Sequence, residues 1–183
     1  MNTCAFGTTD PLYIEYHNHF WGKPLYDSQK LFELLALESQ HAGLSWLTIL
    51  KKKEAYREAF YQFNPYQIAN MTEDDIESLM SFPNIIHHRQ KLRAIVSQAR
   101  GYLQIEQEYE SFSHFLWSFV GGTPIDLQYK TAEERITVND TAKALSKALK
   151  SYGFKFIGPV TVFSFMEAAG MYNAHLIDCP YRI

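Results

Sequence analysis

The chain of 183 residues carries a formal net charge of −3 and is 46% hydrophobic and 20% charged, as expected for an ordinary globular protein. This length allows one domain or two small lobes with a real core. The overall charge excludes a chain that binds polyanions with its whole surface, so any nucleic-acid site must be a local basic patch. The aromatic share of 15% suits dense packing or stacking on flat ligands.

Targeting and membrane-spanning signals are not expected in this chain. No basic segment followed by an apolar run opens the sequence, so we expect no secretory signal. The most apolar window, residues 157–171, is too short to cross a bilayer and contains Glu167. We therefore expect a cytoplasmic protein without membrane contact. In that reducing compartment, we expect metal ligation by Cys4 and Cys179 rather than a disulfide between them.

The first two thirds of the chain are expected to form helices separated by short turns. Residues 10–11, Asp followed by Pro, predict a short helix that carries Tyr13 and Tyr16 on one face. An N-cap signal at residues 27–28 predicts the next helix, which ends at a turn through Gly43. Further helices are expected over residues 45–63, 72–81, 86–105 and 112–120, the second of these after a capping box at 72–75.

The last third is expected to hold two helices behind a long loop. The segments are a loop at 121–137, an amphipathic helix at 138–151, a connection framed by glycines at 153–158 and an apolar helix at 159–170. The basic run Lys51, Lys52, Lys53 and Arg57 is interpreted as a solvated helix face. No stretch alternates between apolar and polar residues with period two. The predicted fold is therefore all-α.

Glu38 lies on the helix stripe that should face the core. It shares the spacing of Leu31, Leu34, Leu35 and Ala42 on one face. A carboxylate there loses hydration and needs hydrogen-bond donors or a cation. One interpretation is a structural Glu that pairs with an Arg or caps a neighbouring helix, and the other is a functional carboxylate. The same part of the chain is crowded with aromatic residues, namely Phe6, Tyr13, Tyr16, Trp21 and Trp46.

The connection at residues 153–158 has features of a strand-gripping hairpin. Gly153 and Gly158 allow a tight turn and a close approach to another surface, and Lys155 adds a positive charge. The helix that follows offers free N–H groups and a positive dipole end to a phosphate. A plain turn between two helices fits the same pattern.

Four residues at opposite ends of the chain make a candidate zinc set. His175 and Cys179 are four residues apart, which predicts that both lie on one helical face, and Cys4 and His17 come from the other end. Two thiolates and two imidazoles form a closed tetrahedral set with no open position for water. The alternative is two buried cysteines and two ordinary histidines.

Several of these features recur together in one known family. The matching residues and motifs are Cys4, residues 10–17, residues 20–22, residues 38–46, residues 153–158, residues 164–166, His175 and Cys179. On these, the chain resembles the bacterial DNA-3-methyladenine glycosylases of type I over essentially its whole length. The resemblance implies one domain over residues 1–183, with a helix–hairpin–helix around 138–170. It also implies one structural zinc that joins the termini, residues 1–27 and 171–183.

The resemblance implies roles for the residues singled out above. The enzyme is expected to flip 3-methyladenine out of alkylated double-stranded DNA, hydrolyse its N-glycosidic bond and release the free base. Glu38 is expected to recognise the base and to act as the catalytic residue. The expected base-binding residues are Phe6, Tyr13, Tyr16, Trp21, Glu38, Trp46 and Ser164; the DNA-binding residues are Gly43, Leu44, Gly153, Lys155 and Gly158; the zinc ligands are Cys4, His17, His175 and Cys179. We expect a monomer.

The chain departs from the wider pattern at three places. Relatives commonly carry Trp where this chain has Phe6, so that wall of the pocket is smaller. The catalytic Asp of the superfamily has its approximate counterpart in Asn173. Strand-cleaving members place a Lys where Pro159 and Val160 stand, so a monofunctional glycosylase without lyase activity is expected. Two other functions stay open: a DNA-binding module without turnover and an enzyme of free nucleosides.

Overall fold

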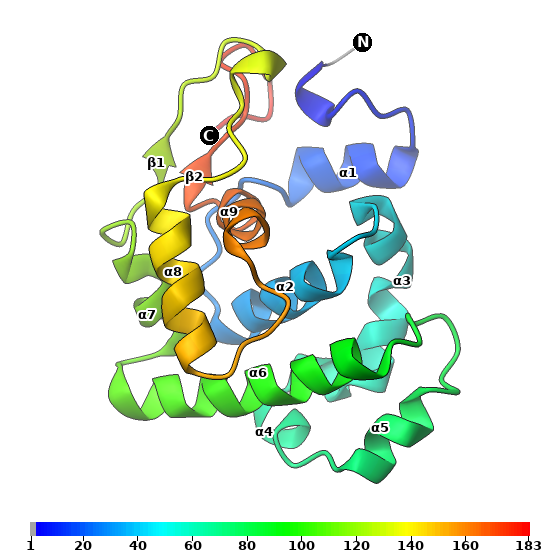
Figure 1. Cartoon of the computed structure of the whole chain (residues 1–183). Helices are drawn as coiled ribbons and strands as arrows, with labels where there is room; N and C mark the ends of the chain where they lie inside the picture. Colours follow the sequence, from blue (N-terminus) through cyan, green and yellow to red (C-terminus); the bar gives the residue numbers. More distant parts are fainter. Residues whose placement is uncertain (1–2) are drawn as a thin grey trace.

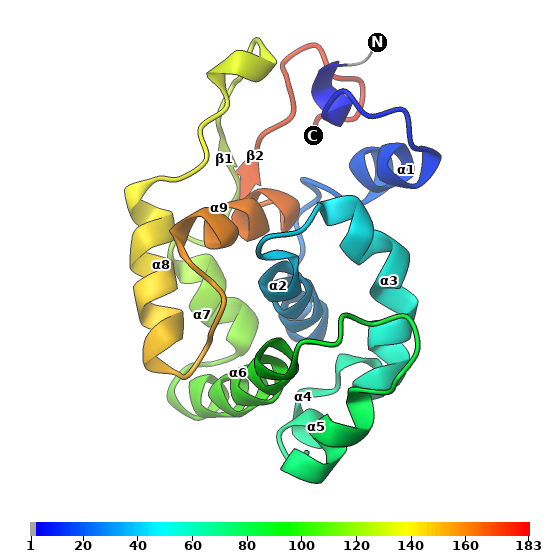
Figure 2. The ribbon, with the colours of Figure 1, turned by 45° about the vertical axis from the view of Figure 1, so that its right-hand side comes forward.

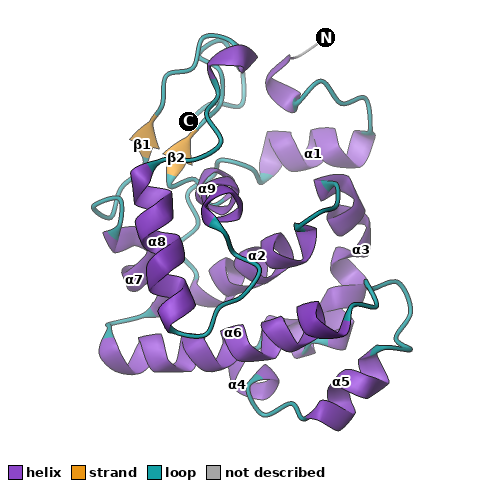
Figure 3. Cartoon of the chain, in the orientation of Figure 1, coloured by secondary structure: helices purple, strands orange, loops and turns teal. Residues whose placement is uncertain are grey.

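The computed structural model describes residues 3–183 and is helical apart from one very small sheet (Figures 1 and 3). In chain order the α-helices are α1 (Pro11–His19), α2 (Ser28–His41), α3 (Trp46–Ala59), α4 (Pro65–Ile68), α5 (Glu73–Leu79), α6 (Arg89–Glu108), α7 (Phe112–Ser118), α8 (Asp140–Ser151) and α9 (Pro159–Ala168). Strands β1 (Ile125–Asp126) and β2 (Tyr172–Asn173) pair in parallel. Short 3₁₀ turns cover Thr3–Ala5, Tyr61–Phe63 and Ala132–Glu134. The predicted all-α class is therefore confirmed.

The helices begin where side chains satisfy their free N–H groups. The predicted capping box is formed, since Thr72 Oγ1 accepts from the Asp75 amide and the Asp75 carboxylate accepts from the Thr72 amide. The helices α6 and α8 begin later than expected because His88 and Asn139 act as their N-caps. Each such cap stabilises its helix by about 1 kcal/mol.

The helix α3 is shorter than expected. It was predicted to reach residue 63 but ends at Ala59, and the residues of the turn Tyr61–Phe63 have positive φ angles of 50°, 55° and 55°. Phe60, directly before this turn, and Phe63, its last residue, are fully buried. Burial of two aromatic side chains outweighs continued helix formation, because each contributes roughly 1.5–3 kcal/mol.

The helix α2 occupies the middle of the molecule (Figures 1 and 2). It packs against α3, α6, α7 and α9. Leu31 and Leu35 are fully buried, and Glu38 on the same stripe is only 2% exposed. The predicted inward direction of Glu38 is therefore confirmed.

The basic run on α3 is only partly solvated. Lys51 is 58% exposed, as expected for a solvated face. The Lys53 and Arg57 side chains instead lie 3.7 Å and 2.9 Å from the carboxylate of Glu33 on α2, whose side chain is 12% exposed. Because this carboxylate is nearly buried, it draws two of the basic side chains inward, and they tie α3 to α2.

The first and last described segments lie side by side at one end of the molecule (Figures 1 and 2). They enclose a small second core that contains Cys4, Trp21, Tyr129, Ala168, Ala174, Leu176 and Cys179. Residues 1 and 2 of the expected terminal segment lie outside the described residues. Within residues 3–183, no helix combines the length and apolarity needed to span a bilayer.

Candidate active site and metal centre

Glu38 supplies the buried carboxylate of the candidate site. Its Oε2 atom lies 3.4 Å from Nδ1 of His41, one helical turn later on α2. Burial raises the pKa of Glu38, while His41 and Ser164 on α9 lower it. Within the described residues, Glu38 forms no ion pair with a Lys or Arg. The interpretation as a structural Glu paired with an Arg is therefore not supported.

A row of aromatic rings runs from the surface towards this carboxylate. Ring centroids are separated by 5.2 Å between Phe6 and Tyr13, 6.2 Å between Tyr13 and Tyr16, and 5.6 Å between Tyr16 and Trp46. Phe6 is 37% exposed and Trp46 only 8% exposed, so the row leads inward. The pKa of Tyr16 is raised well above its ordinary value by burial and by the nearby charge of Glu38. The structure thus brings Glu38 together with four of the predicted ring residues.

Trp21 lies between the ring row and the candidate metal ligands. Its ring is 4.9 Å from Phe6 in an edge-to-face arrangement, and it stacks on His17 at 5.7 Å. Trp21 is 5% exposed and its carbonyl lies 3.1 Å from Nε2 of His175. It therefore supports both the Phe6 wall and the metal centre.

A second carboxyl group, Glu167 on α9, belongs to the same surroundings and was missed from the sequence. Burial raises its pKa to about 8, with the charge of Glu38 raising it further and Arg135 lowering it. A pKa of about 8 favours the protonated form of the Glu167 carboxyl at neutral pH. Ser164 and Glu167 are three residues apart on a mostly apolar helix, and this spacing was the available signal.

Arg135, in the loop before α8, was also missed. Its guanidinium lies 5.2 Å from the Phe6 ring and 5.6 Å from the Trp21 ring. It also donates to the carbonyl of Cys4 at 3.0 Å. A cation over aromatic rings is attracted to them, so Arg135 links the Phe6 ring to the second core around Cys4 and Trp21. The loop gave no periodic pattern from which this contact could be predicted.

The four predicted metal ligands meet in one buried cluster. Their ligand atoms all lie within 4.8 Å of one another. Cys4 Sγ is 3.3 Å from His17 Nε2 and 3.6 Å from His175 Nδ1, while Cys179 Sγ is 3.4 Å from His175 Nδ1 and 3.9 Å from His17 Nε2. Tetrahedral zinc with bonds of about 2.3 Å to sulfur and about 2.0 Å to nitrogen would place these atoms roughly 3.5 Å apart. The donor set therefore fits one zinc ion.

The outward ring nitrogens of both histidines face oxygen atoms. His17 Nδ1 is 2.8 Å from Asn18 Oδ1, and His175 Nε2 is 3.1 Å from the Trp21 carbonyl. Such oxygen partners orient metal-ligating histidines and leave the other nitrogen free for the ion. Burial raises the pKa of Cys4 to about 11 and lowers that of His175 to about 4. A divalent cation would supply the charge that two buried thiolates require.

The predicted helical relation between His175 and Cys179 is wrong. Residues 174–183 contain no helix, and a turn in which the Cys179 amide donates to the Leu176 carbonyl at 3.0 Å joins the two ligands. The Leu176 amide donates to Cys4 Sγ at 3.3 Å, which fits a turn built around a thiolate. The contact between the two predicted ligands therefore comes from a tight turn. A spacing of four residues is compatible with a helix and with such a turn.

Asn173, the approximate counterpart of the superfamily Asp, lies in β2 and is 4% exposed. Its amide nitrogen donates to the Ile183 carbonyl at 2.6 Å. It thus joins the last described residue to the sheet.

Two turns hold the residues predicted to contact DNA. Gly43 has φ of +80° with no atom near the position of a Cβ, and the following Leu44 is 39% exposed. In the connection between α8 and α9, Gly153 has φ of +85°, and Lys155 is exposed. Gly158 is the N-cap of α9 and contributes no side chain, and Pro159 has no N–H group. The N–H groups of Val160 and Thr161 are therefore the ones open to a ligand.

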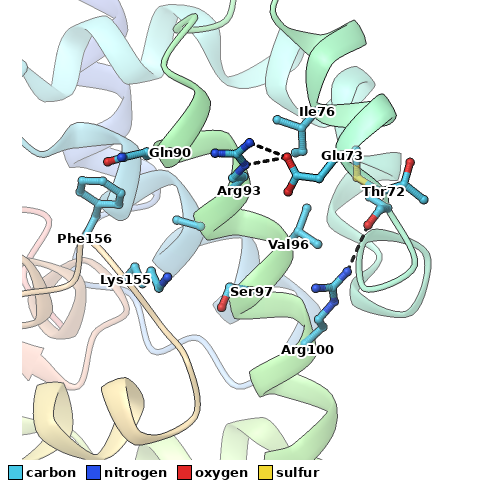
Figure 4. Close-up of a pocket in the computed structure, with 12 residues that line it drawn as sticks. Thr72, Glu73, Ile76, Gln90, Arg93, Val96, Ser97, Arg100, Lys155 and Phe156 are labelled. Atoms are coloured by element: carbon cyan, nitrogen blue, oxygen red, sulfur yellow. Dashed lines mark hydrogen bonds and ion pairs between the residues drawn. The ribbon is translucent and has the colours of Figure 1, made fainter.

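A cleft of about 700 Å³ opens beside the α8–α9 connection, between α5 and α6 (Figure 4). Its lining includes Lys155, Arg93 and Arg100 but none of the predicted base-binding residues. Arg93 is paired with Glu73, and Arg100 donates to the carbonyls of Ala69 and Met71. Two of its three cations are therefore used in packing α5 and α4 onto α6.

Comparison with known proteins decides the family. The family model described as methyladenine glycosylase matches residues 6–183. The chain belongs to this family. The glycosylase is 50% identical to DNA-3-methyladenine glycosylase 1 of Escherichia coli (strain K12) over 179 residues, which are 98% of this chain and 96% of that protein.

Solved structures agree with this assignment. The structure of a Tyr-to-Phe variant of 3-methyladenine DNA glycosylase I in complex with 3-methyladenine has a TM-score of 0.99 and 70% identity, covering 100% of this chain and 98% of that one. A Staphylococcus aureus 3-methyladenine DNA glycosylase I, described for its recognition of 3-methyladenine, has a TM-score of 0.99, 71% identity and coverage of 100% and 97%. The predicted family and the predicted enzyme class, a hydrolase of N-glycosidic bonds, are confirmed.

Proposed function

We propose that this glycosylase removes 3-methyladenine from alkylated double-stranded DNA and leaves an abasic site. The observation that carries the proposal is the Glu38 carboxylate, which is buried beside a row of aromatic rings. Among residues 3–183, no Lys or Arg forms an ion pair with it. Relatives of 70% identity are described as binding this base. A carboxylate kept in so dry a place is costly unless a ligand uses it.

The target base has to leave the duplex to reach Glu38. The carboxylate is 2% exposed, and a base stacked in a helix cannot approach a group at that depth. Base flipping costs a few kcal/mol, and least where the base pair is already weakened by damage. We assign the displacement to Leu44, whose 39% exposed side chain stands on the Gly43 turn just after α2. It would enter the gap that the flipped nucleotide leaves.

Inside the pocket, the rings and the carboxylate share the recognition. Trp46 is the main stacking platform, with Tyr16 and Tyr13 as walls and with Phe6, backed by Trp21, at the outer end. Stacking contributes roughly 1–3 kcal/mol per base. Glu38 accepts a hydrogen bond from the exocyclic amino group and opposes the positive charge that methylation at N3 places on the base in DNA. Ser164, which acts on the same carboxylate, keeps it in place.

The reaction needs little help from the protein because the methylated base is a good leaving group. The bond between the base nitrogen and the sugar carbon breaks, its electron pair stays with the departing base, and water adds to the sugar. As the bond breaks, the positive charge passes from the base to the sugar, and a proton of the added water goes to solvent. Glu38 holds the base through its exocyclic amino group during this step and is the catalytic residue of the proposal. Pro159 and Val160 stand where strand-cleaving superfamily members carry a Lys. That position therefore offers no side-chain amine for lyase chemistry, and we expect the strand to stay intact.

The α8–α9 connection is the proposed grip on the DNA backbone, in the manner of a helix–hairpin–helix. The open amides at the start of α9 and the charge of Lys155 suit a phosphate. Gly153 and Gly158 allow the backbone to approach it closely. These contacts are independent of sequence, as expected for an enzyme that searches DNA for rare damage.

We assign a structural role to zinc. Cys4, His17, His175 and Cys179 would hold one ion and join the two ends of the chain, and the closed donor set leaves no position for water. The zinc would supply structural stability rather than reaction chemistry. The proposal describes a monomeric cytoplasmic enzyme whose products are free 3-methyladenine and an abasic duplex.

The test is a release assay on duplex DNA treated with a methylating agent. We expect free 3-methyladenine to appear while the strand stays intact, and we expect Glu38→Gln to reduce this release at least about 100-fold, because the amide keeps the shape but loses the carboxylate. Binding to undamaged DNA should stay within about twofold of the parent protein. Salt-dependent DNA binding without base release would instead indicate a module without turnover. Turnover of a free nucleoside alone would indicate a different enzyme.

A further inference from the structure

The helix α6 is hydrogen bonded to both turns that we assign to DNA contact. Near its start, Lys91 Nζ donates to the carbonyls of Gln40 at 3.1 Å and Ala42 at 2.6 Å, at the end of α2. Two turns further along, Ser97 Oγ donates to the Gly153 carbonyl at 2.6 Å, and Gln98 Nε2 donates to the Lys155 carbonyl at 3.0 Å. Figure 4 shows Ser97 of α6 facing the connection that carries Lys155. One rigid helix therefore holds both turns.

Lys91 is an unusual group to find in this position. It is only 7% exposed, and no carboxylate pairs with it among the described residues; its recorded partners are carbonyl oxygens. Burying an ammonium group without an acidic partner costs free energy, and the carbonyl groups that it contacts have to offset this cost. The carbonyl end of a helix carries a partial negative charge, and a cation there satisfies otherwise unpaired carbonyls.

The contact between Lys91 and Gln40 is reciprocal. The Gln40 side chain donates back to the Lys91 carbonyl at 3.0 Å, and its oxygen accepts from the Tyr56 hydroxyl of α3 at 3.2 Å. All three side chains are buried. Helices α2, α3 and α6 are thereby joined by one polar network directly behind the Gly43–Leu44 turn.

The turn itself has little packing to hold it in place. Gly43, Leu44 and Ser45 are exposed, and no atom lies near the Cβ position of Gly43. The Ala42 carbonyl that Lys91 binds lies directly before Gly43 in the chain. Lys91 and Ser97 are six residues apart on α6, which is about 9 Å along the helix. The helix thus fixes the distance between the turn and the connection.

We propose that Lys91 is a positioning residue for base extrusion: by holding the carbonyl end of α2 against α6, it keeps the Leu44 turn in register with the α8–α9 connection that grips the strand. This inference rests on the proposed function, because it assigns a step of that reaction to the two turns. A displacement of about 1 Å in such a part can reduce a rate by about 100-fold. Lys91 touches neither the base nor the DNA.

The experiment replaces Lys91 by Met, which keeps the length and removes the donors. The substrate is a methylated duplex with 2-aminopurine beside the damaged base, whose fluorescence reports unstacking. We expect the single-turnover release rate and the fluorescence rise to fall at least about tenfold, while affinity for free 3-methyladenine and the strength of DNA binding stay within about twofold. Lys30→Met, at the exposed opposite end of α2, is the matched control and should change none of these.

A cycle with Leu44→Ala separates positioning from general stability. If Lys91 acts through the turn, Lys91→Met adds little to the defect of Leu44→Ala. Additive defects, or a parallel loss of free-base affinity with normal unstacking in the bound complex, would overturn the proposal. If Lys91→Met does not fold, Lys91→Gln takes its place in the same cycle. A wild-type protein that unstacks the duplex but releases no base would contradict the proposed function alone, and the fluorescence cycle would still decide the role of Lys91.

Discussion

At the scale of single residues, the Glu38 carboxylate sets a pH dependence for base binding. Its pKa is raised from the ordinary value of 4.5 by burial. The ionised carboxylate accepts a hydrogen bond more strongly than the protonated carboxyl group, so affinity for free 3-methyladenine should be highest above the raised pKa and should fall as the pH falls through it. Calorimetric titrations of the wild-type protein and of Glu38→Gln across the acid range would show this step. The base itself titrates in both proteins, so a step of equal size in the two would contradict the assignment.

Glu167 should make the stability of the folded protein depend on pH, with stability falling as the pH rises. Its pKa is raised from 4.5 to about 8, chiefly by burial. At pH values between these two, the folded state keeps a proton on Glu167 that the unfolded state has lost. Stability should therefore decrease as the pH rises from about 5 to about 8. Glu167→Gln should remove this decrease and be more stable than the parent above pH 8 by about 1–3 kcal/mol. Urea unfolding at pH 6 and pH 9 would test this, and an unchanged difference between the two pH values would contradict it.

Single residues were predicted well where a helical stripe or a family motif located them. The inward position of Glu38 followed from the spacing of its apolar neighbours and is confirmed by its 2% exposure. Arg135 and Lys91 could not be found in this way. Arg135 reaches the Phe6 ring from an irregular loop, and Lys91 uses carbonyl groups of another helix, and neither contact leaves a periodic trace in the sequence.

At the scale of elements, the α8–α9 connection should bind DNA without regard to damage. Lys155 is exposed and beside the open amides of α9. Lys155→Glu should weaken binding to methylated and unmethylated duplexes alike by about tenfold at low salt, because a phosphate contact becomes a repulsion. Fluorescence anisotropy at several salt concentrations would measure it, with Lys30→Glu as the control for net charge. A defect confined to damaged DNA would place Lys155 in the base pocket instead.

Element boundaries were harder to predict than the elements themselves. The caps at Asp27 and Thr72 fixed their helices because the capping side chains act locally. The end of α3 and the turn between His175 and Cys179 depend on partners far away in the chain. In the first case buried Phe63 decides the turn, and in the second the thiol of Cys4 does. The local pattern of a single sequence does not reveal which distant residues will contact such a segment.

At the scale of the whole molecule, the cluster of Cys4, His17, His175 and Cys179 brings the two ends of the chain together, and the zinc that we propose there would stabilise this contact. Removal of zinc by a chelator, or Cys179→Ser, should lower Tm by about 10 °C, since a loss of a few kcal/mol shifts a protein of this size by that much. The affinity for 3-methyladenine should fall as well, because Cys4 lies two residues before the Phe6 wall. Scanning calorimetry with metal analysis would measure the change in Tm, and calorimetric titration with 3-methyladenine would measure the change in affinity. An active purified sample without metal and with unchanged Tm would contradict the structural role.

The most direct test of the account is a calorimetric comparison of free 3-methyladenine and adenine as ligands of the wild-type protein and of Glu38→Gln. The account predicts that the wild type binds the methylated base at least about tenfold more tightly than adenine, a difference of at least about 1.4 kcal/mol, and that Glu38→Gln loses most of this preference. Equal affinities of the two bases for the wild type, or a preference that survives in Glu38→Gln, would contradict the role assigned to the buried carboxylate.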